Sequence, residues 1–353
     1  MTNRREGGGE LGLALVARMN ELTRERTSGL ALANARRNRA VLGRGKSLAE
    51  LRGASIGEGE SAVVIAAGPS MRRRDPARAI LDSGYTGAVV TTESALLYCL
   101  RSGLVPDLTV SVDPHADRIV RWFGDPSLTE EALRRDDYFS RQDQDAAFAD
   151  EMRANREILE LIDRYGSRLR IALATSASKA VVNRVLEVGM DVYWWNPMLD
   201  DPDRDGSMTA RLQAENGLPS VNAGGNVGAA AWMMATEVLG KAQVALTGVD
   251  FSYYDDTPYR NTQYWREAVD LVGEDNLESI FIRIFNPHLK SWFFTDPAYM
   301  WYCECLLAMI ADSSCRTSNC TEGGILFGEN MPFEPLRDFL SRQTSARAAT
   351  AVG

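Results

Sequence analysis

Short apolar runs alternate with segments of helical pattern along most of this chain, and this alternation restricts its fold more than any other feature. Apolar runs of about five residues rich in valine, isoleucine and alanine are typical of strands buried on both faces. The expected strands cover residues 61–67, 88–92, 108–112, 169–174, 192–195 and 243–246. The expected helices cover residues 76–81, 93–102, 145–165, 178–188 and 227–239. This order predicts an α/β fold with a Rossmann-like, doubly wound, mostly parallel sheet that carries helices on both faces.

The first expected strand ends in a turn of small residues, Gly68, Pro69 and Ser70. Gly68 has no Cβ, so a phosphate can approach its backbone closely, and the Ser70 hydroxyl can cap a following helix. We therefore predict that this turn contacts a nucleotide phosphate. The alternative is an ordinary strand-to-helix turn without a ligand.

Polar residues also follow the later strands. In doubly wound sheets, ligands bind beyond the carboxyl ends of the strands, at the point where the strand order reverses. The residues expected there are Glu93 and Ser94 after the second strand, Asp113 and His115 after the third, Asn196 after the fifth, and Gly248 and Asp250 after the sixth. Each residue alone is typical of a cap or turn, but their common edge predicts a single binding site.

A second glycine turn, formed by Gly224, Gly225 and Asn226, precedes the long apolar helical segment. Unpaired N–H groups and the helix dipole at such a start suit a phosphate or a carboxylate. The alternative is that the glycines only permit close packing of helix and sheet.

The chain has only two histidines, so an imidazole base must be His115 or His288. His115 lies at the expected ligand edge, whereas His288 lies among aromatic residues and is expected to be structural. No G-x-G-x-x-G motif follows the first strand, which disfavours hydride transfer. The motifs of serine hydrolases and zinc proteases are also missing, which disfavours a hydrolase.

Charge and hydropathy restrict the partners. The formal net charge is −9, and residues 1–60 hold 11 Lys and Arg against 7 Asp and Glu, so the acidic charge lies in the rest of the chain. An acidic body argues against nucleic acid as a partner. No apolar run approaches the roughly 18–20 residues that cross a bilayer, so we expect no transmembrane segment and a cytoplasmic location.

Residues 1–57 are expected to form an N-terminal helical arm and linker, because apolar residues at helical spacing are followed by basic residues and then by glycines. Residues 58–345 are expected to form the catalytic domain, with a charged helical excursion at 124–165. Residues 346–353 are expected to be a disordered tail.

Seven short motifs resemble, in order and spacing, those of the MptE-like family. They are VIAAGPS at 64–70, SAL at 94–96, PD at 106–107, SVDP at 111–114, GNVG at 225–228, LTGVDF at 246–251 and NCTEGG at 319–324. The resemblance implies a Rossmann-like, sialyltransferase-like core. It also implies one of two chemistries. Motility accessory factors are associated with glycosylation of flagellin by nonulosonic acids, and archaeal 6-hydroxymethylpterin diphosphokinases transfer diphosphate from ATP with Mg²⁺. The motility branch usually has a histidine soon after its G-x-D motif, and residues 251–259 here have none.

The leading hypothesis is a glycosyltransferase that uses a nucleotide-activated, CMP-nonulosonic-acid-like sugar. The alternatives are an MptE-like diphosphokinase, which transfers diphosphate from ATP to an alcohol such as a hydroxymethylpterin, and a nucleotide-binding scaffold without turnover. The acceptor is expected to be a protein or a small alcohol. No cofactor is certain, although Mg²⁺ is expected in the diphosphokinase, bound by Asp113 and Asp250 from adjacent strand ends.

Roles are assigned to the edge residues under the leading hypothesis. The donor phosphates are expected to contact Gly68, Pro69, Ser70, Gly224, Gly225 and Asn226, with Ser94 and Gly248 also in the nucleotide site. Glu93 and Asn196 are expected to orient the sugar or the base. Asp113, His115 or Asp250 is expected to deprotonate the acceptor hydroxyl.

Overall fold

A nine-stranded sheet forms the centre of the molecule, and all of its strand pairings in the described residues are parallel. The computed structural model describes residues 29–116, 118–131 and 151–352. The strands are β1 (Lys46–Ser47), β2 (Ser61–Ile65), β3 (Ala88–Thr92), β4 (Leu108–Ser111), β5 (Arg170–Ala174), β6 (Asp191–Pro197), β7 (Ser220–Val221), β8 (Gln243–Thr247) and β12 (Arg316–Asn319). The predicted doubly wound, parallel α/β fold is confirmed.

The strand order is β1-β6-β5-β4-β3-β2-β8-β12, and β7 pairs with β6. From β2 the chain adds β3, β4, β5 and β6 on one side, and it then returns to place β8 on the other side of β2. The order therefore reverses between β2 and β8. In doubly wound sheets, this reversal point opens the crevice in which ligands bind.

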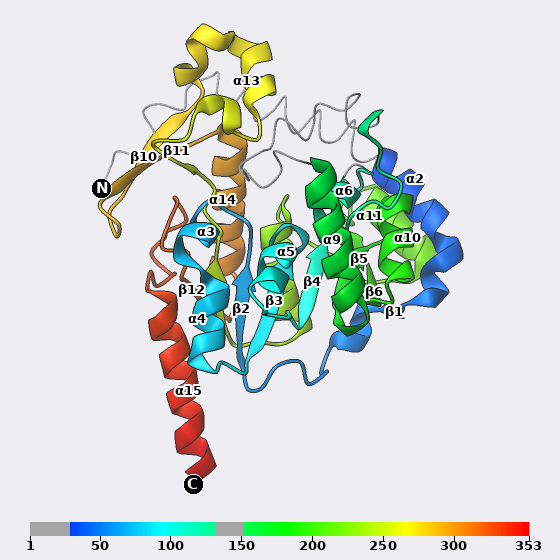
Figure 1. Ribbon diagram of the computed structural model, residues 1–353, viewed down its shortest axis with the longest axis horizontal. Coiled ribbons are helices and arrows are strands. Elements are labelled where there is room, and N and C mark those ends of the chain that lie inside the picture. The colour runs from blue at the N-terminus through cyan, green and yellow to red at the C-terminus, as the bar shows by residue number, and fades with distance from the viewer. Residues whose placement is uncertain (1–28, 117, 132–150, 353) are drawn as a thin grey trace.

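Helices cover both faces of the sheet (Figure 1). One face carries α3 (Ser70–Arg74), α4 (Pro76–Ser83), α5 (Glu93–Arg101), α6 (Arg118–Trp122), α9 (Glu151–Tyr165), α10 (Lys179–Glu187) and α15 (Leu336–Val352). The other carries η3 (Leu48–Leu51), α12 (Val227–Met233), its continuation η6 (Met234–Val238), and α14 (Pro297–Ala311). Helix α15 thus includes most of the segment 346–353, for which a disordered tail was expected.

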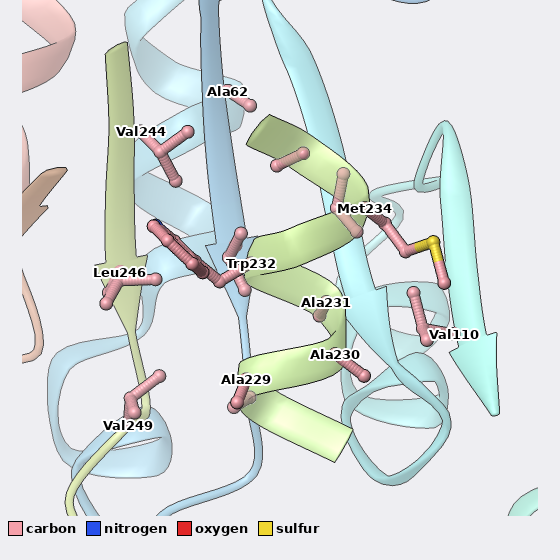
Figure 2. Close-up of a cluster of buried hydrophobic side chains, with 14 of the residues drawn as sticks. Ala62, Val110, Ala229, Ala230, Ala231, Trp232, Met234, Val244, Leu246 and Val249 are labelled. Carbon is pink, nitrogen blue, oxygen red and sulfur yellow. The ribbon is translucent and has the colours of Figure 1, made fainter. Parts of the chain in front are cut away.

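Alternation along the strands explains the two cores. In β2, Val63 and Ile65 point to the α4 and α15 face, whereas Ala62 and Val64 point to α12. Helix α12 meets the sheet with a run of three alanines, 229–231, whose small side chains let the helix approach closely (Figure 2). Trp232 follows the alanines, and its Nε1 donates to Thr317 Oγ1 at 2.9 Å. Close approach of α12 sets the height of its first turn above the carboxyl edge of the sheet.

A small lobe, residues 253–295, is inserted between β8 and α14 (Figure 1). It contains β9 (Tyr253–Tyr254), β10 (Ile282–Asn286) and β11 (Ser291–Thr295) in an antiparallel sheet, with η7 (Tyr259–Asn261), α13 (Trp265–Val272) and η8 (Glu274–Ser279). Stacked aromatic rings form its core, including Tyr253 on Phe294 with centroids 5.3 Å apart. Because the lobe follows β8 directly, it lies at the carboxyl edge of the sheet.

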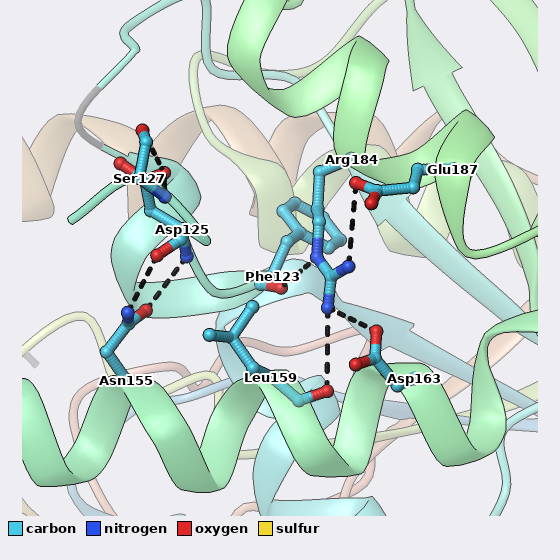
Figure 3. Close-up of polar contacts among 8 residues, drawn as sticks. All are labelled: Phe123, Asp125, Ser127, Asn155, Leu159, Asp163, Arg184 and Glu187. Atoms are coloured by element: carbon cyan, nitrogen blue, oxygen red, sulfur yellow. Dashed lines mark hydrogen bonds and ion pairs between the residues drawn. The ribbon is translucent and has the colours of Figure 1, made fainter.

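The described part of the charged excursion packs onto the main body. Arg184 of α10 is buried, and it donates to the Phe123 carbonyl at 3.1 Å and to Asp163 at 2.7 Å (Figure 3). Asn155 of α9 exchanges two hydrogen bonds of 2.8 Å with the backbone of Asp125. These contacts hold residues 123–125 against α9 and α10.

The predicted N-terminal arm is represented by α2 (Gly29–Asn38), followed by η2 (Arg39–Arg44). The part of the expected arm at residues 1–28 lies outside the described residues. Asn34 donates to the carbonyls of Pro114 and Ser176, and Asn38 to those of Thr175 and Ala177, at 2.8–2.9 Å. Helix α2 is therefore bound to the loops after β4 and β5 through two buried amides.

Candidate functional site

Three residues predicted for the site, Gly68, Gly248 and Asp250, meet at the reversal point between β2 and β8. The two strands stay paired beyond their ends, with Ala66 N donating to Thr247 O at 2.9 Å and Gly68 N to Gly248 O at 2.8 Å. A Cβ on Gly68 would lie 2.1 Å from Asp250 Oδ2 and 2.5 Å from Gly248 O. Gly68 is therefore required so that the carboxylate of Asp250 can lie against this turn.

Asp250 takes the position at the start of α3 that a phosphate was expected to take. The Ser70 hydroxyl donates to Asp250 Oδ2 at 2.7 Å, and the Ser70 N–H donates to the same carboxylate at 3.2 Å. Ser70 is fully buried, and Pro69 before it is half-buried at the N-cap of α3. Because both Ser70 donors already bind Asp250, the expected phosphate contact at Ser70 has no donor left in this arrangement.

A loop after β12 encloses Asp250 from the other side. A Cβ on Gly323 would lie 2.7 Å from Asp250 Oδ1, and one on Gly324 would lie 2.2 Å from the backbone oxygen of Asp250. Asp250 is only 2% exposed. The glycine pair was part of the family resemblance, but nothing in its sequence indicated that it covers a carboxylate.

Burial raises the pKa of Asp250 to about 7, although hydrogen bonds from Ser70 and the charges of Arg73 and Arg74 act to lower it. The unfolded chain has an ordinary aspartate pKa near 3.8. Between pH 3.8 and pH 7, the folded state binds the proton of Asp250 more tightly than the unfolded chain does. Asp250 therefore stabilises the fold fully below pH 4, and this contribution is lost as the pH rises toward 7.

We expect Asp250→Asn to flatten the pH dependence of stability between pH 4.5 and 7. One proton contributes at most about 1.4 kcal/mol per pH unit, so the slope of the unfolding free energy should become less negative by roughly 1 kcal/mol per unit. Urea unfolding at several pH values measures this slope.

Asp200→Asn is the control for this experiment. Burial raises the pKa of Asp200, but hydrogen bonds from Met208, Thr209 and Ser207 outweigh it and lower the pKa to about 2. This variant should change stability without changing the slope above pH 4.5. Equal slopes in wild type and Asp250→Asn would contradict the raised pKa.

Asp113 and His115 come together at the end of β4. The backbone N–H of His115 donates to Asp113 Oδ1 at 2.9 Å, so the carboxylate closes a short turn that holds the histidine. Both residues are half-buried. A carboxylate and an imidazole that solvent can reach are suited to proton transfer at this edge.

The structure corrects the expected Mg²⁺ site. Asp113 follows β4 and Asp250 follows β8, and β3 and β2 lie between these strands. Three strand spacings place the strand ends about 14 Å apart, whereas Mg²⁺ holds its oxygen ligands at about 2.1 Å. The two carboxylates are not on adjacent strands and do not fit one ion. In the part of the chain that the structure describes, no cluster of three or more His, Cys, Asp or Glu is arranged to hold a metal.

The end of β3 lies between these two groups of residues. Glu93 begins α5 and is 5% exposed, and Ser94 beside it is half-buried. The Ser94 hydroxyl lies 2.9 Å from that of Thr92. Ser94 therefore lies at the end of β3, between the ends of β2 and β4.

Asn196 belongs to a structural network. Its Nδ2 donates to Asn216 Oδ1 and to the Leu218 carbonyl, and its Oδ1 accepts from Thr175 and from Asn216 Nδ2, all within 3.1 Å. These four bonds use its full hydrogen-bonding capacity, and the side chain is fully buried. The expected contact of Asn196 with a sugar or base is therefore not available in this fold.

Helix α2 covers the same end of the sheet, and sequence reasoning did not find its role. Asn34 and Asn38 are four residues apart on one helical face, and this spacing was the available signal. Their amides bind the loops after β4 and β5. Helix α2 thus covers the end of β5 and borders the end of β4, where Asp113 and His115 stay half-buried, so we take the ends of β4, β3, β2 and β8 as the accessible part of the edge.

The turn at residues 224–226 stands above this accessible part. Gly228 lies over the end of β2, where its Cβ would be 3.9 Å from that of Ala66. Asn226 caps α12 by accepting from Ala229 N at 2.9 Å. Gly225 is exposed, and it must be a glycine because its φ is +80° and because the Trp301 and Tyr302 rings lie where a Cβ would stand.

In the described residues, every helix is too short or too polar to cross a lipid bilayer.

The chain was compared with known proteins. No family model matches it, and no curated protein matches it significantly. Among solved structures, the fold is similar to that of a MAf glycosyltransferase from Magnetospirillum magneticum AMB-1, with 14% sequence identity and a TM-score of 0.48. The match covers 84% of this chain and 38% of that chain, so this chain corresponds to well under half of the length of that glycosyltransferase.

Proposed function

We propose that this chain is a nucleotide-dependent transferase of the MptE-like family, and that it transfers a sugar from a CMP-nonulosonic-acid-like donor to an alcohol. The strand order supports this proposal most directly. The order reverses between β2 and β8, and Gly68, Gly248 and Asp250 meet at that reversal. Doubly wound sheets bind nucleotides at such a point.

The accessible edge suggests a division of roles. The donor phosphates contact the backbone turn at Gly225 and Asn226, and Ser94 orients the sugar. His115, held by Asp113, takes the proton from the acceptor hydroxyl. The axes of β2 and β4 are about 10 Å apart with β3 between them, so the ends of these three strands form a stretch of edge that one sugar ring and the side chains of two loops can cover.

Asp250 has a positioning role in this proposal. Its pKa of about 7 is that of a useful general base, but Gly68 and Gly323 enclose the carboxylate. It therefore fixes the turn between β2 and α3, which forms the floor of the donor site.

Thermal unfolding with added nucleotides tests the proposal. At 100 times its dissociation constant a ligand stabilises the fold by about 2.7 kcal/mol, which should raise the melting temperature by several degrees. We expect this rise with CMP and with a CMP-nonulosonic acid, and release of CMP from the latter on longer incubation. The control is the same set of measurements with ATP, with and without Mg²⁺.

A rise with ATP and Mg²⁺ but with no cytidine nucleotide would contradict a sugar-nucleotide transferase and favour the diphosphokinase, which would then be detected by AMP release with a pterin alcohol. Binding of the CMP-sugar with no CMP release under any condition would favour the scaffold.

A further inference from the structure

Helix α14 presents a tryptophan to solvent close to the proposed donor site. Trp301 is 38% exposed, and Glu304, one turn further along α14, is also exposed. An exposed tryptophan gives up part of the stabilisation that burial would provide.

The indole lies directly against the glycine turn. A Cβ on Gly225 would be 2.9 Å from Trp301 Cζ3 and 2.7 Å from Tyr302 Cε1, so the two rings contact the backbone of that turn. Gly228, three residues further on, lies over Ala66 at the end of β2. Three residues span at most about 11 Å, so Trp301 is within the length of one nucleotide from the reversal point.

The start of α14 is anchored at the same edge. Asp296 caps the helix by accepting from Ala298 N and Tyr299 N, both at 2.9 Å. Thr295 just before it donates to the Phe251 carbonyl at 2.7 Å, next to Asp250. These bonds fix the first turns of α14, and therefore Trp301, relative to the end of β8.

Tyr302 restrains the orientation of the indole. The centroids of the Trp301 and Tyr302 rings are 5.4 Å apart, with an interplanar angle of 56°. The Tyr302 hydroxyl lies 3.4 Å from that of Tyr264 in the small lobe. Trp301 is thus a partly exposed aromatic surface that contacts Tyr302 and the Gly225 turn, and its exposed part can stack on a flat ring.

Glu304 adds a hydrogen-bond acceptor to this surface. Residues three apart on a helix are neighbours, so Glu304 shares the exposed face of α14 with Trp301. A carboxylate accepts hydrogen bonds from an exocyclic amine, such as N4 of cytosine or N6 of adenine. Uracil has a carbonyl oxygen at the corresponding position, which a carboxylate repels.

We propose that Trp301 and Glu304 form the base subsite of the donor, with Trp301 stacking on an amino-bearing nucleobase and Glu304 accepting from its exocyclic amine. The inference rests on the proposed function and extends it to a choice of base. It selects cytidine and adenosine nucleotides over uridine nucleotides.

Tryptophan substitutions test the stacking contact. CMP bound at this subsite should quench the fluorescence of the Trp301 indole. The wild-type protein and Trp301→Phe should therefore be quenched to different extents, because the phenylalanine variant has no indole at the site. Trp292→Phe is the matched control, since Trp292 in the small lobe is 48% exposed and pairs with Phe285 away from the glycine turn. In calorimetry, Trp301→Ala should weaken CMP binding about 10-fold or more, and Trp301→Phe should weaken it less.

Glu304→Ala tests the choice of base. The wild type should bind CMP and AMP several-fold more tightly than UMP, and the variant should lose most of this preference. Comparison of CMP with AMP shows which amino-bearing base fits better.

The outcomes separate the inference from the proposed function. Tight CMP binding that is unchanged in Trp301→Ala, or equal quenching in wild type and Trp301→Phe, would overturn the base subsite and leave the transferase proposal standing. Equal or tighter binding of UMP by the wild type would overturn the role of Glu304. If the wild type binds none of the nucleotides, the transferase proposal fails and the base subsite fails with it. Trp301→Phe keeps a ring in place and provides the result if the alanine variant does not fold.

Discussion

Alanine at position 68 is expected to lower the free energy of unfolding by about 2–4 kcal/mol, although it adds a single methyl group. The new Cβ would lie 2.1 Å from Asp250 Oδ2 and 2.5 Å from Gly248 O. Neither neighbour can move freely, because the carbonyl accepts from Gly68 N and the carboxylate accepts from Ser70. The expected result is a lower urea midpoint at an unchanged m-value.

Gly43→Ala is the matched control. A Cβ at Gly43 would have no atom within 4 Å, and the backbone there is not in the left-handed region. Removing the flexibility of this glycine should leave stability unchanged or raise it by up to about 1 kcal/mol. If Gly68→Ala matched this control in stability but lost nucleotide binding, Gly68 would serve ligand approach, as the sequence suggested, and not the packing of Asp250.

The central sheet could be predicted because its strands are buried on both faces and appear as unbroken apolar runs. Strand β12 gave no such signal, since it reads Arg-Thr-Ser-Asn. Its last three residues, 317–319, are buried, and partners elsewhere in the chain satisfy two of them: Thr317 accepts from Trp232, and Asn319 donates to the Leu326 carbonyl. Sequence patterns do not reveal such distant partners.

The residue types at the site could also be predicted, but their grouping could not. Asp113, His115 and Asp250 all follow strands, as expected. Which strands are neighbours depends on where the chain inserts β8, and the linear sequence does not state that β8 returns beside β2. The expected pairing of Asp113 with Asp250 was wrong for this reason.

Likewise, Ser70 and Asn196 are the polar types that bind ligands, yet burial and protein partners use their hydrogen bonds. Satisfaction of buried polar groups depends on tertiary contacts. A turn residue that contacts a ligand and one that holds the fold together therefore look the same in a sequence.

His115→Ala is expected to reduce the rate of CMP release from a CMP-nonulosonic acid, with water as the acceptor, by about 10²- to 10⁴-fold. The imidazole is half-buried at the end of β4, on the accessible part of the edge. Loss of a base leaves donor binding intact, so CMP affinity should change little. His288→Ala is the control for loss of an imidazole, because His288 stacks on Phe333 with centroids 4.6 Å apart, outside the proposed site.

Asp113→Asn shows whether Asp113 or His115 is the general base. Asparagine keeps a side-chain oxygen that can accept from the backbone N–H of His115, so the turn that holds the histidine should persist. If His115 is the base, this variant retains most of the rate, whereas a loss as large as that of His115→Ala would assign the base to Asp113. Full rates in both variants would place the base away from the end of β4. Asp250 could not then replace it without movement of the 68 and 323 turns, because Gly68 and Gly323 separate its carboxylate from any acceptor hydroxyl.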